Sequence, residues 1–150
     1  TEQANSHFAN SHAALAVDLI DAMKRTFGDE GLAKLVEART EDQIMAYREE
    51  LNGAETLKEQ LATLADIRSR EGYMAALCEG EQEGEYLLVE NHCPICEAAR
   101  SCTSLCSSEL SVFEAVLGDQ VDVERLDHII LGARRCVYRC REKASHSHAD

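Results

Sequence analysis

The spacing of apolar residues changes at Gly72, and no other feature constrains the fold as strongly. Before Gly72, apolar side chains recur every three or four residues. One such series is Leu15, Leu19, Met23 and Phe27. After Gly72, they come in short runs bounded by polar turns, as in Tyr73–Cys78 and Tyr86–Val89. The first spacing predicts amphipathic helices and the second predicts short strands.

The order of these patterns along the chain predicts the fold class. Helical segments are expected throughout the first half, with breaks at Gly28, at Arg39-Thr40 and at Asn52-Gly53. Two strands, a helix that ends at Gly118, and two more strands follow. Helices followed by a β-β-α-β-β unit with a small antiparallel sheet belong to the α+β class.

Three segments are expected to differ in role. Residues 1–28 are interpreted as a dimerisation or linker helix, because their apolar stripe is wide enough to serve as the seam of a homodimer. Residues 29–142 are interpreted as the effector domain. Residues 143–150 form a polar, histidine-containing end that predicts a disordered tail.

The net charge of −13 excludes several kinds of partner. A domain that binds nucleic acid by itself has a basic surface. An anionic membrane repels an acidic protein. The chain also has no apolar run near the roughly 20 residues that a membrane-spanning helix needs. A cytoplasmic protein without membrane contact is therefore expected.

The cysteines are clustered, which points to metal or redox chemistry. Four of the seven fall in one short segment, at positions 93, 96, 102 and 106, and Cys136 and Cys140 follow near the end. Two cysteine pairs at such spacing can in principle form a zinc site. Cys136 and Cys140 lie about 13 Å apart along a strand, so at most one of them joins the site. Cys136 is the better candidate, and Cys140 and Cys78 are expected to be core residues.

A family resemblance rests on several short motifs taken together. They are Glu90-Asn91-His92-Cys93-Pro94-Ile95, Cys106 followed by Glu109, Leu117-Gly118, His128, and Gly132-Ala133-Arg134-Arg135-Cys136-Val137-Tyr138-Arg139. This combination resembles the C-terminal domain of SufR-type regulators, which are iron–sulfur-sensing, winged-helix transcriptional repressors.

The resemblance implies a function and a set of ligands. It implies that Cys93, Cys106 and Cys136 hold an iron–sulfur cluster, with a [4Fe–4S] cluster favoured. Additional ligands are expected among Cys96, Cys102 and His92. The chain would then be a redox-sensing effector domain in transcription regulation. It would reach DNA only through a winged-helix domain that this sequence does not contain.

Two alternatives remain open. Thiolates bind zinc as well as iron–sulfur clusters, so a zinc-binding regulatory domain fits the same cysteines. A small-molecule-binding module of the vinyl-reductase type would also end in a cysteine-rich strand pair. An enzyme is not expected, because the sequence contains no nucleophile elbow and no phosphate-binding loop.

Overall fold

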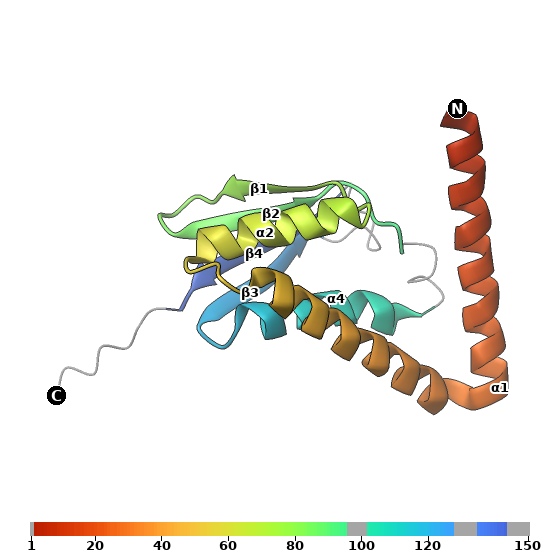
Figure 1. Ribbon diagram of the computed structural model, residues 1–150. Coiled ribbons are helices and arrows are strands. Elements are labelled where there is room, and N and C mark those ends of the chain that lie inside the picture. Colours follow the sequence, from red (N-terminus) through yellow and green to blue (C-terminus); the bar gives the residue numbers. More distant parts are fainter. Residues whose placement is uncertain (1, 96–101, 128–134, 144–150) are drawn as a thin grey trace.

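The computed structural model describes residues 2–95, 102–127 and 135–143 (Figure 1). Its elements, in chain order, are α1 (Glu2–Leu51), α2 (Leu57–Arg70), β1 (Ala75–Glu79), β2 (Glu85–Glu90), α4 (Thr103–Leu117), β3 (Val121–Asp127) and β4 (Cys136–Glu142). The α+β class and the β-β-α-β-β order are confirmed. The expected division of the chain into residues 1–28, 29–142 and 143–150 stays a prediction.

The first half differs from expectation because α1 bends at Gly28 instead of ending there. Gly28 has φ 74° and ψ 177°, a backbone conformation that residues with a Cβ rarely adopt. Helical conformation resumes directly after it, so the glycine kinks the helix. Thr40 does not start a new helix either. Its hydroxyl donates to the carbonyl of Val36 at 2.7 Å, a bond that an interior helical residue makes with the preceding turn.

Helix α2 has a clear signal at each end. Thr56 is its N-cap, and the Thr56 hydroxyl accepts a hydrogen bond from the Glu59 amide at 3.1 Å. The Glu59 carboxylate in turn accepts from the Glu55 amide at 2.9 Å. Gly72, with φ 98°, allows the chain to turn from the helix toward β1.

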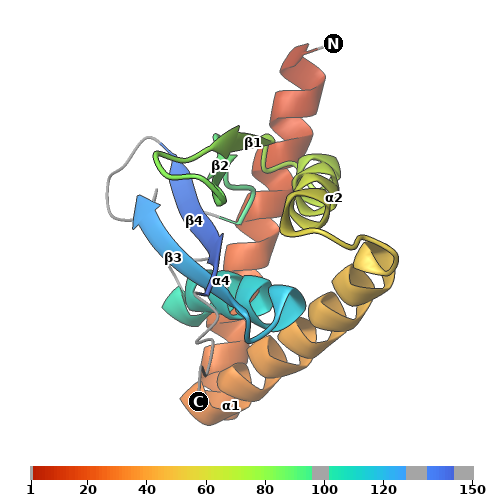
Figure 2. The ribbon, with the colours of Figure 1, turned by 90° about the vertical axis from the view of Figure 1, so that its left-hand side faces the viewer.

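The four strands form one antiparallel sheet in the order β1-β2-β4-β3. The register of β3 against β4 shifts between Arg125 and Asp127. Helices α2 and α4 lie on the same face of the sheet, α2 against β1 and β2 and α4 against β3 (Figure 2). The second half of α1 packs against both helices.

The main core lies between this sheet face and the helices. Its most deeply buried members are Leu61, Leu64, Leu88, Val112, Phe113, Tyr138 and Cys140. Tyr138 and Leu88 are cross-strand neighbours, and the Phe113 ring meets the Tyr138 ring edge to face at 4.8 Å. None of the helices described has the length and apolar character needed to cross a membrane.

Candidate functional site at the buried thiols

A buried arginine lies at the centre of the helix–sheet interface. Arg68, from α2, places its Nε 2.6 Å and its Nη2 3.1 Å from the two carboxylate oxygens of Glu90, at the end of β2. The Nη1 of Arg68 lies 2.6 Å from the carboxylate of Glu109, on α4. Arg68 therefore connects α2, β2 and α4 through two buried carboxylates.

Aromatic side chains enclose this ion cluster. The guanidinium carbon of Arg68 lies 3.4 Å from the centre of the Tyr73 ring, and its Nη1 donates to the Tyr47 hydroxyl at 3.2 Å. The Tyr47 hydroxyl donates to the Glu71 carboxylate at 2.6 Å. Burial raises the pKa of Tyr47 to about 12, so this hydroxyl keeps its proton at neutral pH.

The charges in the cluster shift the pKa of each partner. Burial alone would lower the pKa of Arg68, but its hydrogen bond to Glu90 and the charge of Glu109 raise it overall. Burial raises the pKa of Glu90, and this effect exceeds the lowering by Arg68. Because two carboxylates share one fully buried guanidinium, the negative charge here is only partly balanced. Arg39, 3.8 Å from Glu109, adds a half-exposed positive charge.

A second cation, Arg125 on β3, faces two of the predicted cysteine ligands. Its Nη2 donates to the backbone carbonyl of Cys106 at 2.9 Å and to the Tyr138 hydroxyl at 3.0 Å. Burial would lower the pKa of Arg125, but Tyr138 and the thiols of Cys106 and Cys136 raise it overall. The buried Cys106 and Cys136 side chains therefore lie close to one positive charge.

Cys93 lies close enough to Tyr73 to influence its ionisation. It is half-buried, and its charge, after burial and Glu109, is among the causes that raise the pKa of Tyr73. Cys136 is the cross-strand partner of Glu90. Glu90 in turn precedes Cys93 by three residues along the chain. The fold thus brings Cys93, Cys106 and Cys136 to the end of the sheet where Arg68 and Arg125 lie.

These three thiols do not form a metal site as they stand. Within residues 2–95, 102–127 and 135–143, no group of three or more Cys, His, Asp or Glu side chains is arranged to hold a metal ion. The expected metal-binding cysteine cluster is therefore corrected for the described part of the chain. His92 is exposed, and Cys96 lies outside the described residues.

Cys102 has separate surroundings. It is the N-cap residue of α4. Its sulfur lies 3.0 Å from the Ser104 hydroxyl. Apolar side chains from both sides of the Gly28 kink and from α4 surround it: Ile20, Met23, Leu32, Val36 and Leu105. Cys102 is 5% exposed, so this second, smaller core encloses a free thiol.

The remaining described cysteines differ from each other. Cys140 is a core residue, as expected, and burial raises the pKa of its thiol to about 12. The expectation for Cys78 is wrong, because this residue is exposed on β1, at the edge of the sheet.

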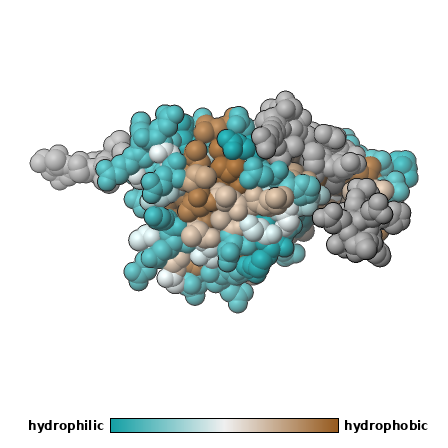
Figure 3. Space-filling view, turned by 90° about the horizontal axis from the view of Figure 1, so that it is seen from above, coloured by the Kyte–Doolittle hydropathy of each residue, from teal (hydrophilic) through white to brown (hydrophobic). Residues whose placement is uncertain are grey.

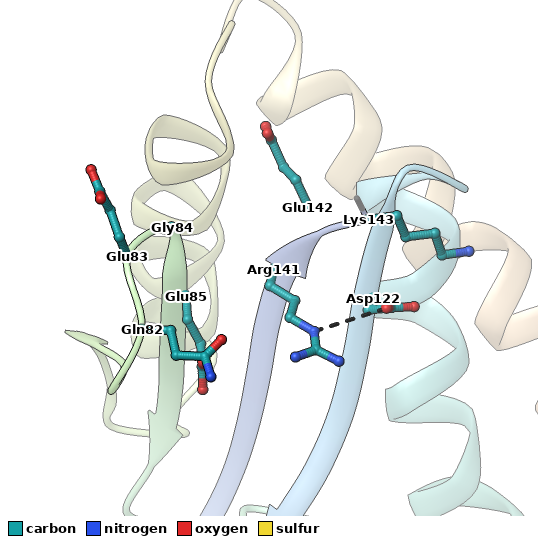
Figure 4. A pocket seen from close by; sticks show the side chains of 8 residues that line it. All are labelled: Gln82, Glu83, Gly84, Glu85, Asp122, Arg141, Glu142 and Lys143. Atoms are coloured by element: carbon teal, nitrogen blue, oxygen red, sulfur yellow. Dashed lines mark ion pairs between the residues drawn. The ribbon is translucent and has the colours of Figure 1, made fainter. Parts of the chain in front are cut away.

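A polar pocket opens at the opposite end of the sheet (Figure 4). It is lined by Gln82 to Glu85, Asp122, and Arg141 to Lys143. The Nε of Arg141 lies 4.0 Å from Asp122, and side chains of both charges surround the space. No thiol lines this pocket, so it is separate from the cysteines.

The sequence prediction missed the two arginines. Arg68 continues the spacing of Leu57, Leu61 and Leu64 on the apolar face of α2, and a charged residue on such a face is a signal of buried pairing. Glu90 and Glu109 belong to the motifs quoted above but received no role. Arg125 sits in an alternating strand, and nothing in its spacing distinguishes it from a solvent-facing residue.

Comparisons with known proteins identify the fold. No family model and no curated protein sequence matches the chain. The solved structure of a trafficking protein particle complex subunit 3 from Naegleria fowleri, covalently bound to palmitic acid, is similar with a TM-score of 0.56. The match covers 93% of this chain and 97% of that chain, at 15% sequence identity.

This likeness corrects the interpretation drawn from the sequence motifs. The chain has the fold of a trafficking complex subunit over nearly its whole length, so its interpretation as a SufR-type sensor domain is wrong. The functions that this interpretation implied, an iron–sulfur-sensing effector role and transcription regulation, are therefore also wrong. The motifs misled because they cover about a third of the chain, whereas the fold match spans both the helices and the sheet.

Proposed function

We propose that this chain is a binding module, not an enzyme, and that it carries an acyl chain as a thioester on Cys102. The proposal is carried by one observation: a free, buried thiol at the start of α4 lies inside an apolar cluster. A protein with the same fold is covalently bound to palmitic acid, which supports an acyl group as the ligand.

The position of Cys102 suits acyl transfer to its sulfur. Cys102 is the N-cap residue of α4, so its side chain lies beside the first turn of that helix, where backbone N–H groups favour negative charge that develops on a reacting group. The thiolate would attack the carbonyl carbon of an acyl-coenzyme A. The bond between that carbon and the coenzyme A sulfur breaks, and coenzyme A leaves as a thiolate that takes up a proton.

The surroundings of Cys102 suit the chain of an acyl group. The sulfur lies between α4 and the two halves of α1, in a small apolar cluster to which all three contribute. Separating these helices by a small amount would admit an alkyl chain. Its burial there would gain about 0.8 kcal/mol per methylene group.

The test is acylation by palmitoyl-coenzyme A, followed by intact mass and peptide mapping. We expect one palmitoyl group per chain, attached to Cys102 and removed by hydroxylamine. The Cys102→Ser variant should stay unmodified. The Cys78→Ser variant is the matched control, because Cys78 is an exposed thiol outside the cluster. Modification of Cys78 at the same rate as Cys102, or no modification of Cys102, would overturn the proposal.

A second candidate function is binding of a thiolate-held cofactor by Cys93, Cys106 and Cys136. It is favoured by Arg125, whose positive charge faces Cys106 and Cys136 and would stabilise their thiolates. An iron–sulfur cluster or a zinc ion would suit three thiolates, with additional ligands from Cys96, Cys102 or His92. Binding would have to draw these thiols closer together than they lie here.

Metal analysis separates the two candidates. Protein purified without oxygen should contain stoichiometric iron and sulfide, or zinc, if the second candidate is correct. Replacing Cys93, Cys106 and Cys136 with serine should then remove the metal, whereas Cys102→Ser alone should affect acylation. Both proposals suit the cytoplasm, whose reducing conditions preserve thiols.

A further inference from the structure

Strand β1 lies at one edge of the sheet, and alternate residues of this strand direct their backbone groups toward β2. Directly before β1, the carbonyl of Met74 accepts from the Asn91 amide. Directly after it, the Gly80 amide donates to the Glu85 carbonyl. Hydrogen bonds in an antiparallel pair alternate along the strand, so the even-numbered residues of β1 bond to β2. The backbone groups of the odd-numbered residues therefore point away from the sheet: Ala75, Leu77 and Glu79.

One of these three residues is covered and the other two are open. The Ser69 hydroxyl, on α2, accepts from the Ala75 amide at 3.1 Å and donates to the Ala75 carbonyl at 2.9 Å. Leu77 and Glu79 have no strand beside them among the described residues, because β1 is the last strand of the sheet. Outward N–H and C=O groups of this kind are a template for a further strand.

The opposite edge of the sheet is protected, whereas this one is not. Strand β3 has a register shift between Arg125 and Asp127 and carries exposed acidic side chains at Asp122 and Glu124. Irregular pairing and charge are usual means by which an edge strand avoids adding another strand. Residues 75–78 of β1 are uncharged and pair regularly with β2. Strand β1 is the uppermost strand in Figure 1, so Figure 3 looks down onto this edge, and apolar side chains gather in the middle of that face.

One side of β1 is apolar and exposed. Leu77 packs against the main core, so the side chains of Ala76 and Cys78 lie on the opposite face of the sheet. Both of them are exposed. A strand added beside β1 would place every second side chain on this face, where small apolar residues leave room for larger apolar ones.

The other side of β1, which faces α2, is acidic. Lys58 lies 3.9 Å from Glu79, and Ser69 bonds to Ala75, so one side of α2 runs along β1. Asp66 lies about two turns after Lys58 on that side of the helix and is exposed. The Glu79 side chain is 81% exposed. Two carboxylates therefore face the position of an added strand, and Lys58 offsets only one of them.

We propose that β1 binds an extended segment of a partner protein, with alternating basic and apolar side chains, as a fifth strand of the sheet. The backbone of the segment bonds to Leu77 and Glu79. Its basic side chains face Asp66 and Glu79, and its apolar side chains lie beside Ala76 and Cys78. A second copy of β1 fits less well, because its residues include no basic side chain and pairing would bring two chains of net charge −13 together.

The test is amide hydrogen exchange of the isotope-labelled protein, followed by NMR with and without the peptide Lys-Val-Arg-Val-Lys-Val. In the free protein, the amides of Leu77 and Glu79 should exchange fast and those of Ala76 and Cys78 slowly. When the peptide is bound, exchange at Leu77 and Glu79 should slow by about tenfold or more, because these amides then bond to the added strand. A peptide with glutamate in place of each lysine and arginine is the control and should give no protection.

Two variants locate the binding site, with peptide affinity measured by fluorescence anisotropy. Glu79→Pro removes an outward N–H group and no hydrogen bond within the sheet, so it should abolish binding while keeping the circular dichroism of the wild type. Asp66→Lys should weaken binding by about tenfold, because it replaces an attractive charge with a repulsive one. Asp119→Lys is the matched control, since Asp119 is an exposed carboxylate in the turn before β3, at the opposite edge of the sheet.

Three results would overturn the proposal. The first is unchanged exchange at Leu77 and Glu79 in the presence of the peptide. The second is equal weakening by Asp66→Lys and Asp119→Lys, which would mean that the peptide follows net charge and not this edge. The third is protection of the same two amides that rises with protein concentration in the absence of peptide, because a second copy of the chain would then occupy the edge.

Discussion

The Nε of Arg68 lies 2.6 Å from a carboxylate oxygen of Glu90, and both side chains are buried. A buried ion pair of this kind contributes little net stability compared with apolar residues of the same shape, but the loss of one partner leaves an uncompensated charge. Here the loss of Arg68 would leave two such charges, because Glu109 shares the same guanidinium. The pair therefore fixes how α2, β2 and α4 meet.

Replacing Arg68 with methionine should destabilise the protein by about 3–5 kcal/mol, because Glu90 and Glu109 then lose their buried partner. Urea denaturation followed by circular dichroism measures the change. Arg70→Met is the control, since Arg70 pairs with Glu50 at the surface. It should cost less than about 1 kcal/mol. Equal effects of the two substitutions would contradict the role of the buried cluster.

The thiol of Cys140 should make the protein less stable as the pH rises. Its pKa is raised by burial from 9.0 to about 12, so the folded state holds this proton more tightly than the unfolded state. The resulting stability is fully present below pH 9 and is lost as the pH rises toward 12. The loss amounts to at most about 4 kcal/mol.

Urea denaturation at several pH values between 8 and 11 tests this prediction. The Cys140→Ala variant should show a shallower decline than the wild type, although the cavity it creates lowers its stability at every pH. Alkylation at pH 8 provides an independent measurement. Iodoacetamide should modify the exposed Cys78 and leave Cys140 unmodified in the folded protein. Parallel pH curves for wild type and variant would rule out the linkage.

Replacing Thr56 with alanine should lower the stability by about 1 kcal/mol. The Thr56 hydroxyl caps α2 by accepting from the Glu59 amide, and alanine leaves this amide without its partner. Thr40→Ala is the matched control, because the Thr40 hydroxyl only donates back to Val36 inside α1. Alanine is the better helix former there, so the control should be neutral or slightly stabilising. Thermal unfolding of both variants measures the difference.

The sequence predicts the fold class because apolar spacing reports local structure directly. The apolar stripe of α2 and the four strands followed from it. The continuity of α1 did not, because Gly28 usually marks the end of a helix and its kink is fixed by contacts made later, at Cys102. The ion cluster was missed for a similar reason. Arg68, Glu90 and Glu109 are far apart in the sequence, and only the packing of α2 and α4 on one sheet face brings them together.

Replacing Gly28 with alanine should expose the thiol of Cys102. The conformation of Gly28, φ 74° and ψ 177°, costs a residue with a Cβ about 1–3 kcal/mol, and straightening α1 relieves this strain. Ile20 and Leu32 both belong to the cluster around Cys102 only because the kink folds the two halves of α1 toward each other. In a straight helix these residues lie about 18 Å apart along the axis, too far for both to contact one sulfur.

The rate of Cys102 alkylation, followed by peptide mass spectrometry, measures this exposure. We expect Gly28→Ala to raise the rate several-fold above that of the wild type. Gly53→Ala is the control, because Gly53 also has a positive φ, 100°, and an added Cβ meets no neighbour at either position. Gly53 lies beyond the end of α1, so its substitution strains the backbone without straightening α1 at Gly28. An unchanged rate in Gly28→Ala, or the same rise in both variants, would mean that the kink does not hold the cluster closed.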